Sequence, residues 1–332
     1  MPKVSVIVPV YNSEQELRDC LDSLVEQTEK DIEIIVIDDG STDNSPEIEA
    51  EYQKKYPNVK VYRNERNLGQ SEMRNRGIEL AEGDYIAFLD SDDYVNLGMY
   101  EELYQAAVDN NMPELIVTGL SFVKGNEYRK KDLTFIGKQS TTIIHPMDNP
   151  DQVFFESPSL CNKLFRKDTV KNYKFLDVSA WEDIAFSYSR FMEANTVISK
   201  PTLNYFYRRN ASLKSNGVSA QNFKENDKIT DIFIVADELE EELKRNGKYP
   251  FFADQIRALQ IACCLQRVDE VNEWQESTTK EKVKDMMYST MLEKYGDLEG
   301  IDTGLLSSKT GFSIMDEYNS YISEHKNNQN KR

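Results

Sequence analysis

Short apolar runs alternate with segments of helical spacing along the first 120 residues of the chain. Runs rich in branched and aromatic residues predict strands at residues 4–10, 32–37, 59–62, 85–89 and 115–118. Apolar positions three and four residues apart predict helices between these strands, at residues 17–25, 45–56, 71–81 and 99–110. Because strands that alternate with helices form βαβ units, we expect an α/β fold with a mostly parallel sheet flanked by helices.

The pattern changes after residue 120. Alternating polar and apolar positions at residues 121–145 predict a hairpin or an irregular excursion, and residues 181–194 predict an amphipathic helix. Two short strands are predicted at residues 160–165 and 201–208. We place residues 1–120 and 121–216 in two halves of one α/β domain.

Beyond residue 217 the spacing is helical throughout. The predicted helices are at residues 229–243, 251–268, 280–295 and 312–322. Residues 325–332 are polar, and we expect this tail to be disordered. Residues 217–332 are therefore predicted to form a helical C-terminal region with a polar tail.

Three carboxylates follow the strand predicted at residues 85–89. Asp90, Asp92 and Asp93 lie at its carboxyl end, which is where open α/β sheets bind their ligands. Two bare carboxylates roughly 4 Å apart repel each other by about 4 kcal/mol at an effective dielectric constant of about 20. A divalent cation would turn this repulsion into binding, and carboxylate oxygens suit Mg²⁺, Mn²⁺ or Ca²⁺. The alternative is that these residues only cap a turn or the helix that begins near Met99.

A second acidic pair, Asp38 and Asp39, follows the strand predicted at residues 32–37. Parallel strands of one sheet would bring both acidic clusters to the same edge, where a single nucleotide-sized ligand could contact both. The alternative is that Asp38 and Asp39 only form a turn before Gly40. Near the first strand, Ser13 and Glu16 have the spacing of a capping box.

The formal charge of −18 is unevenly distributed. Residues 1–120 carry −16, residues 121–216 carry +5 and residues 217–332 carry −7. So acidic a chain is a poor candidate for binding nucleic acid. The basic middle part is a candidate for facing an anionic ligand, and the alternative is an ordinary solvated surface. Because the chain has only two histidines, a His-based zinc site or a Ser-His-Asp triad is disfavoured, and we expect carboxylates to carry any catalysis.

The sequence also bears on location. No apolar run is long enough to span a membrane, and the N-terminus lacks the pattern of a signal peptide. The four cysteines have no metal-ligand spacing. We therefore expect a cytoplasmic protein, with peripheral contact at the inner face of the membrane as an open alternative.

The first 95 residues resemble the family-2 glycosyltransferases of the GT-A fold, of the kind that builds bacterial polysaccharides and cell walls. Five segments carry the resemblance in the family's order and spacing, which are residues 4–12 (VSVIVPVYN), 37–43 (IDDGSTD), 67–69 (NLG), 73–75 (MRN) and 88–93 (FLDSDD). Two weaker matches follow, at residues 181–183 (WED) and 205–209 (YFYRR). Residues 217–332 match nothing that we regard as common to the family.

The resemblance implies a Rossmann-like nucleotide-binding sheet and transfer of a hexosyl group from a nucleotide-sugar. Pro9 and Tyr11 would border the base, and Asp39 would bond the base or the ribose. Arg74 would lie against the base or a phosphate. The other donor-binding residues implied are Asn67, Asp90, Ser91 and Arg208.

The resemblance further implies that Asp92 holds Mn²⁺ or Mg²⁺ under the diphosphate, and that Asp183 is the general base. Transfer from a diphosphate requires that the charge of the leaving group be neutralised, and a metal with a cation achieves this without proton transfer. A single, inverting displacement then needs one carboxylate base and no covalent nucleophile. Two simpler interpretations remain open. Glu182 and Asp183 could be only the acidic first turn of a helix, and Arg208 and Arg209 could be surface charges rather than a diphosphate clamp assisted by Lys163.

The expected partners are a nucleotide-sugar donor, with UDP-sugars favoured, and a glycan or a lipid-linked or phosphorylated polysaccharide acceptor. The C-terminal helices are candidates for self-association or membrane contact, although their charge disfavours anionic lipid. Two other functions are weighed against transfer. One is a phosphoacceptor signalling domain, which also has paired acids after strands. The other is a relative that binds a nucleotide-sugar without turnover.

Overall fold

The computed structural model of the 332-residue chain describes residues 1–124, 127–133, 140–178, 180–208, 227–272, 274, 277–302, 306 and 312–329. Its strands are β1 (Val4–Val10), β2 (Ile32–Asp38), β3 (Val59–Arg63), β4 (Tyr85–Phe88), β5 (Tyr94–Val95), β6 (Leu115–Lys124), β7 (Glu127–Leu133), β8 (Thr142–Ile144), β9 (Lys163–Arg166) and β10 (Val197–Arg208). The helices of the α/β part are α1 (Leu17–Val25), α2 (Ser45–Lys55), α3 (Gln70–Leu80), α4 (Met99–Asp109), η1 (Pro150–Phe155), α5 (Lys167–Val170) and α6 (Glu182–Glu193).

All these strands belong to one sheet. The order along it is β3-β2-β1-β4-β9-β6-β10-β5, with β7 beside β6 and β8 beside β10. The first half is parallel, because β1 pairs in parallel with β2 and β4, and β2 with β3. The second half is mixed, because β9 runs antiparallel to both β4 and β6, while β6 and β10 are parallel. The carboxyl ends of β1, β2, β4, β6 and β10 therefore lie along one edge of the sheet.

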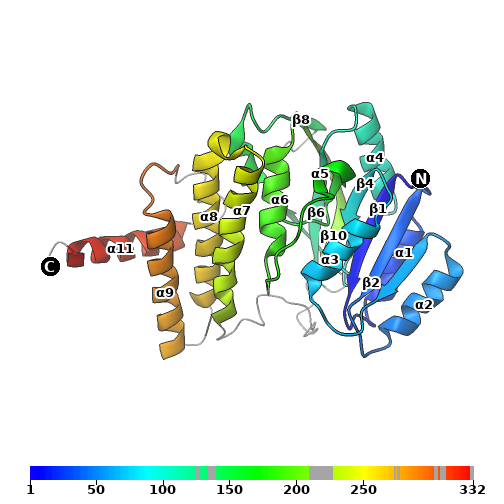
Figure 1. Ribbon diagram of the computed structural model, residues 1–332, viewed down its shortest axis with the longest axis horizontal. Helices are drawn as coiled ribbons and strands as arrows, with labels where there is room; N and C mark the ends of the chain where they lie inside the picture. The colour runs from blue at the N-terminus through cyan, green and yellow to red at the C-terminus, as the bar shows by residue number, and fades with distance from the viewer. Residues whose placement is uncertain are drawn as a thin grey trace.

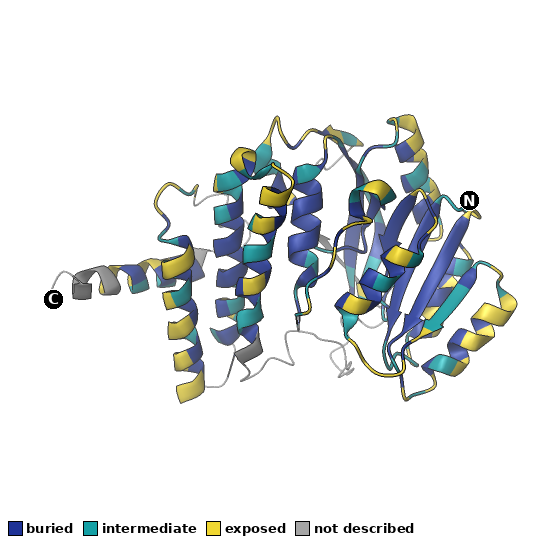
Figure 2. Cartoon of the chain, viewed as in Figure 1, coloured by how far each residue is buried: buried dark blue, intermediate teal, exposed yellow. Residues whose placement is uncertain are grey.

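The centre of the sheet is fully buried. Every residue of β1 and β2 is buried, as the continuous apolar runs predict for strands covered on both faces. Helix α3 lies very close to β1, because a Cβ atom built on Gly77 would collide with the side chain of Ile7. Figure 2 shows this buried layer running from the sheet into the helices beside it.

The predicted hairpin after residue 120 is confirmed as the antiparallel pair of β6 and β7, with residues 125–126 and 134–139 outside the described part. The predicted division between residues 120 and 121 falls inside β6, which pairs with β7, β9 and β10. The sheet thus continues without interruption from one predicted half to the other.

The C-terminal region is helical, as predicted. It contains η3 (Asp227–Thr230), α7 (Asp231–Arg245), α8 (Tyr249–Asn272), α9 (Thr278–Tyr295) and α11 (Phe312–Gln329). Helices α6, α7 and α8 run side by side, with α7 in the middle, and α11 extends away from them (Figure 1). The expectation of a disordered tail from residue 325 is wrong as far as Gln329, because α11 continues to that residue.

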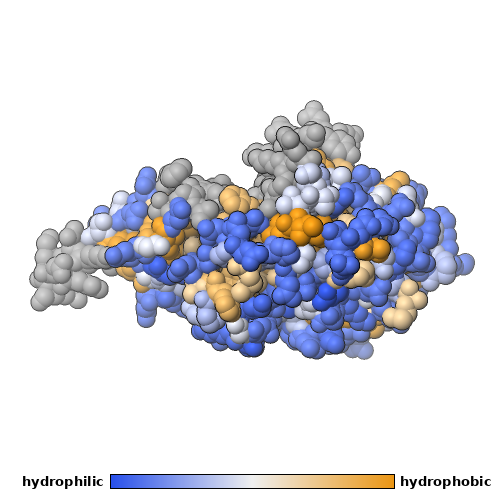
Figure 3. Space-filling model, turned by 90° about the horizontal axis from the view of Figure 1, so that it is seen from above, coloured by the Kyte–Doolittle hydropathy of each residue, from blue (hydrophilic) through white to orange (hydrophobic). Residues whose placement is uncertain are grey.

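No described helix has the length and hydropathy needed to cross a bilayer. The face drawn in Figure 3 is mostly hydrophilic, and its apolar side chains lie in separate groups. Peripheral membrane contact and self-association remain predictions.

Candidate active site

The loops that follow β1, β2 and β4 meet at the carboxyl edge of the sheet. Pro9 is buried in β1 opposite Ile37, and half-buried Tyr11 follows the strand directly. The Ser13 hydroxyl lies 2.7 Å from that of Ser91, which joins the loop after β1 to the loop after β4. The two acidic clusters are therefore at one edge, as predicted from parallel strands.

Asp39 holds the loop between β3 and α3. Its side chain is fully buried and accepts hydrogen bonds from the Asn64 amide at 2.7 Å and from the backbone N–H groups of Leu68 and Gly69 at 2.8–3.0 Å. The carboxylate thus fixes the loop that carries Asn67, which is exposed at the edge. Because the oxygens of Asp39 already have these partners, Asp39 shapes this edge of the sheet by holding the loop in place.

Asp90 and Arg74 form the centre of the site. The Asp90 carboxylate accepts hydrogen bonds from Gln70 and from Arg74, each at 3.2 Å. Arg74 is buried on α3, lies over the ring of Phe175 and forms a second ion pair, with Glu182. The acidic surroundings raise the pKa of Arg74 despite its burial. Arg74 therefore joins the strand-end cluster to the start of α6.

The two neighbouring aspartates differ in their partners. Asp93 is buried, and its carboxylate accepts hydrogen bonds from the Tyr205 hydroxyl and from the Arg208 backbone, so it ties β10 to the loop. Asp92 is half-buried and forms no ion pair with any described residue. Burial and then the charge of Asp90 raise the pKa of Asp92 to about 6. Of the two, Asp92 is the one available to a ligand.

Asp183 lies in the first turn of α6, one residue after Glu182. It forms no ion pair within the described residues. Burial and then the charge of Glu182 raise the pKa of Asp183 to about 7, and Arg74 opposes this rise. The charge of Asp90, in the strand-end cluster, raises the pKa of Asp183 as well.

Helix α6 is anchored to the sheet by Phe186. Its ring packs edge-on against Phe88 of β4 at 5.9 Å and against Phe165 of β9 at 5.0 Å. Since positions three apart share one face of a helix, this anchor also orients Asp183. Trp181, just before the helix, has a φ of 65° and a ψ of 15°, a left-handed conformation that costs a bulky residue about 1–3 kcal/mol.

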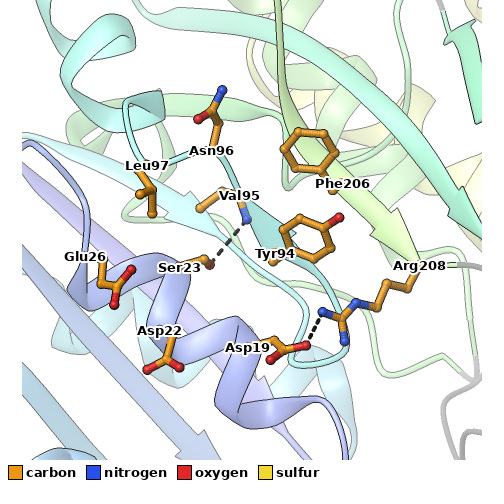
Figure 4. A pocket seen from close by; sticks show the side chains of 10 residues that line it. All are labelled: Asp19, Asp22, Ser23, Glu26, Tyr94, Val95, Asn96, Leu97, Phe206 and Arg208. Atoms are coloured by element: carbon orange, nitrogen blue, oxygen red, sulfur yellow. Dashed lines mark hydrogen bonds and ion pairs between the residues drawn. The ribbon is translucent and has the colours of Figure 1, made fainter. Parts of the chain in front are cut away.

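Arg208 is half-buried at the end of β10. Its guanidinium pairs with Asp19 at 2.6 Å and lies over the Tyr94 ring (Figure 4). The pocket in Figure 4, of about 510 Å³, lies between α1 and β5 and contains Arg208 but none of the other predicted site residues. We therefore regard this pocket as a neighbour of the site and not as the donor site itself. Arg209 lies outside the described residues.

The suggested role of Lys163 in a diphosphate clamp is wrong. Its side chain is fully buried, pairs with Glu156 at 2.8 Å and donates to the carbonyls of Ser157 and Ser159. Arg190 is likewise buried and paired, with Glu242 and Glu193. Part of the +5 charge of residues 121–216 is thus neutralised inside the fold and forms no basic surface.

The strand-end carboxylates of Asp90 and Asp92 fit a hard divalent cation. No group of three or more His, Cys, Asp or Glu side chains converges as a cage within the described ranges. Asp92, with Asp90 beside it, instead offers few oxygen ligands, which is the arrangement that Mg²⁺ and Mn²⁺ use when substrate phosphates complete the shell. The donor set therefore suits a metal that is shared with a diphosphate.

The motifs did not reveal three of these relationships. These are the Arg74–Glu182 pair, the Gln70–Asp90 bond and the contact of Ser13 with Ser91. The available signal for the Arg74–Glu182 pair was the triplet at residues 181–183. This triplet indicated Asp183 as a functional residue but gave no partner for Glu182.

Comparison with known proteins bears on the family. A model of glycosyl transferase family 2 matches residues 5–172, which is just over half of the chain. The uncharacterized glycosyltransferase EpsJ of Bacillus subtilis is 34% identical over 220 residues, covering 63% of this chain and 62% of EpsJ. The poly(ribitol-phosphate) beta-glucosyltransferase of Bacillus spizizenii is 34% identical over 211 residues, covering 62% of this chain and 32% of that protein. The chain thus spans less than two thirds of either relative.

A solved structure supports the fold over nearly the whole chain. Residues 1–349 of S. aureus TarS, in complex with UDP-GlcNAc, superpose with a TM-score of 0.58 at 22% identity, covering 98% of this chain and 92% of that one. The predicted GT-A fold with a helical C-terminal region is confirmed. Because the family model covers both strand-end acidic clusters and the loop between them, we conclude that this chain belongs to glycosyl transferase family 2.

Proposed function

We propose that this chain is an inverting, metal-dependent glycosyltransferase with Asp183 as its general base. It would move a hexosyl group from a nucleotide-sugar to a hydroxyl of a glycan. The observation that carries the proposal is a pair of carboxylates in different surroundings. Asp92 lies at the strand end beside Asp90, while Asp183 lies in the first turn of α6, which the ion pairs of Arg74 with Glu182 and Asp90 tie to that strand end, and its pKa is raised to about 7.

The chemistry requires one proton transfer. The acceptor oxygen attacks the anomeric carbon while the bond from that carbon to the diphosphate breaks, and the acceptor's proton passes to the Asp183 carboxylate. A base whose pKa lies near the working pH is well matched to this step, which typically contributes about 10²–10⁴-fold. One displacement from the opposite face inverts the anomeric centre, and no covalent nucleophile is needed.

On the donor side we propose that the base and ribose lie at the carboxyl edge, bordered by Pro9, Tyr11, the Asp39-held loop with Asn67, Arg74, Asp90 and Ser91. A divalent metal held by Asp92 would neutralise the leaving diphosphate. Arg208, at the end of β10, would add a cation after leaving Asp19. We favour UDP as the nucleotide, and the UDP-GlcNAc complex of TarS agrees with this preference.

We propose a phosphorylated or lipid-linked glycan as the acceptor. One support is the similarity to the poly(ribitol-phosphate) beta-glucosyltransferase of Bacillus spizizenii, whose name describes a phosphorylated acceptor. The other is the net charge of +5 of residues 121–216. In the described residues several of these cations are internally paired. The proposal therefore depends on the cations of this segment that have no internal partner, of which exposed Lys171 is one in the described residues.

Thermal shift with UDP, GDP, ADP and CDP, each with and without Mn²⁺, tests the donor site. Specific binding at a hundredfold excess over Kd stabilises the fold by about 2.7 kcal/mol. We expect one nucleotide to give a shift that requires Mn²⁺ and that disappears in Asp92→Asn. Asp109→Asn, at the exposed end of α4, is the matched control and should keep the shift. A metal-independent shift that survives Asp92→Asn would contradict the assignment.

Asp183→Asn tests the base. We expect the donor shift to remain while transfer falls by about 10²–10⁴-fold. Asp177→Asn, an exposed aspartate in the loop before α6, should retain transfer. Full transfer by Asp183→Asn would make the assignment of the base wrong.

Family membership makes the phosphoacceptor alternative wrong. A protein that binds a nucleotide-sugar without turnover remains the second candidate. It predicts the same metal-dependent shift with no release of nucleoside diphosphate in the presence of any acceptor.

A further inference from the structure

The residue that precedes the first turn of α6 is in a strained conformation. Trp181 is one of four non-glycine residues with positive φ in the part of the chain that the structure describes, and it is the largest of them. Its carbonyl oxygen accepts the hydrogen bond from the Ile184 N–H at 3.0 Å, which closes the turn that contains Glu182 and Asp183. The conformation of Trp181 therefore fixes the direction in which that turn begins.

A side chain from the C-terminal helices lies on the Trp181 ring. The guanidinium carbon of Arg267, on α8, is 4.9 Å from the ring centre, within the range of a cation–π contact. Arg267 is 13% exposed and pairs with Glu270 one helical turn later, at 3.0 Å. The guanidinium of Arg267 is planar, partly desolvated and held by its ion pair with Glu270, so it is suited to keeping an aromatic ring in place.

Arg267 and Asp183 also have a common neighbour. Burial raises the pKa of the Tyr188 hydroxyl, the charge of Asp183 adds to the rise, and the charge of Arg267 opposes it. Tyr188 lies on α6 one turn after Ile184. The contact of Arg267 with Trp181 thus lies at the start of α6, although α7 lies between α6 and α8 along most of their length.

We propose that Arg267 is a positioning residue, which holds Trp181 in its left-handed conformation and so directs the Asp183 carboxylate towards the acceptor. The inference rests on the proposed role of Asp183 as the base. It gives the helical region a part in catalysis, and the contact lies well outside residues 5–172 that the family model covers.

The first test needs no substrate. The chain has two tryptophans, so Trp274→Phe leaves Trp181 as the sole indole emitter. In this background Arg267→Met, which keeps the aliphatic length and removes the cation, should change the Trp181 emission and speed hydrogen exchange at the Ile184 amide. Arg257→Met is the matched control. Arg257 is on the same helix and donates to the carbonyls of Tyr295, Asp297 and Glu299, so its loss should leave both signals unchanged.

The second test measures turnover as the release of nucleoside diphosphate, with water in place of the acceptor, from sugar conjugates of the nucleotide that the thermal-shift screen selects. We expect Arg267→Met to lower kcat on the order of 100-fold, with the donor KM changed by no more than about twofold. Arg267→Lys should recover part of the loss. Glycine adopts the left-handed conformation without strain, so Arg267→Met should add little to Trp181→Gly.

Unchanged emission and exchange, together with a kcat per folded molecule equal to that of Arg257→Met, would overturn the inference. Independent effects of Arg267→Met and Trp181→Gly on kcat would overturn it as well. Absence of turnover in the unmodified chain, with water and with every acceptor offered, would contradict the proposed function instead, and the emission and exchange signals alone would then decide whether Arg267 holds Trp181.

Discussion

Arg74 on α3 forms a buried ion pair with Glu182, which lies 108 positions later in the chain at the start of α6. The same guanidinium pairs with Asp90, so one cation neutralises a carboxylate from each side of the site. The pair brings the helix that carries Asp183 to the strand end that carries Asp92. Its charges also decide how readily Asp183 gives up its proton.

Removal of Arg74 should destabilise the fold. In Arg74→Gln the carboxylates of Asp90 and Glu182 lose their shared cation while still largely desolvated, and we expect a loss of about 3–5 kcal/mol in the free energy of unfolding. Urea denaturation measures it. Arg76→Gln, two residues along α3, removes a partly exposed arginine that bonds Asn64, and should cost clearly less. Equal losses of unfolding free energy in the two variants would show that the buried ion pair contributes no more to stability than the partly exposed arginine does.

The pH dependence of kcat should move in opposite directions in two variants. In the unmodified chain we expect kcat to rise with pH and to level off above about 7, because Asp183 must be ionised to accept a proton. Glu182 raises the pKa of Asp183, so Glu182→Gln should shift this limb to lower pH. Arg74 lowers it, so Arg74→Gln should shift the limb to higher pH. If both variants shift the limb in the same direction, or if neither shifts it, the pH dependence of kcat does not arise from Asp183.

Lys163→Met should be among the most destabilising single changes. It leaves the Glu156 carboxylate buried without its cation, and we expect a loss of about 3–5 kcal/mol by urea denaturation. Lys171→Met, on an exposed side chain shortly after β9, should change stability by less than about 0.5 kcal/mol. The double variant Lys163→Met with Glu156→Leu should recover part of the loss, since it leaves no unpaired charge. No recovery would point to packing rather than to the charge as the cause.

Glu49 should make stability depend on pH. Burial and then the charge of Asp38 raise the pKa of Glu49 to about 8, and its Oε1 atom is buried without a hydrogen-bond partner. Between about pH 4.5 and 8 the unfolded chain releases this proton while the folded chain keeps it, so stability decreases across that interval and is level above it. Glu49→Gln removes this pH-dependent loss of folding stability.

The variant should match the unmodified chain near pH 4 and exceed it by on the order of a few kcal/mol at pH 8, measured by thermal or urea unfolding. Glu47→Gln, exposed on the same helix, serves as the control. A gain that is equal at both pH values would mean that ionisation of Glu49 is not its cause.

The local pattern predicted most helices and strands well. The strand predicted at residues 4–10 is β1, and that at residues 32–37 is β2 without its last residue, because an apolar run covered on both faces leaves little choice of structure. The direction of β9 was beyond such reasoning. A run such as Lys163–Arg166 looks the same whether its neighbours are parallel or antiparallel, and only the fold of the whole chain decides it.

Partners distant in sequence account for the failures at the site. Ser13 has the spacing of a helix cap, yet α1 begins at Leu17 without a side-chain cap and the Ser13 hydroxyl contacts Ser91 instead. Lys163 is a cation in the right region, but its burial beside Glu156 cannot be inferred from residue type. The motifs identify which residues gather at the edge, whereas their pairing depends on three-dimensional contacts that a single sequence does not display.

The unbroken sheet has a consequence for chimeric enzymes. A crossover at residue 120 between this chain and a relative would join two parents within β6, whose 10 residues must pair with β7, β9 and β10 at once. The hybrid would have to satisfy strand neighbours inherited from both parents. Acceptor preference is therefore better exchanged by replacing loops at the carboxyl edge than by exchanging halves of the domain. The smallest part of this fold that can be transferred intact is the whole sheet.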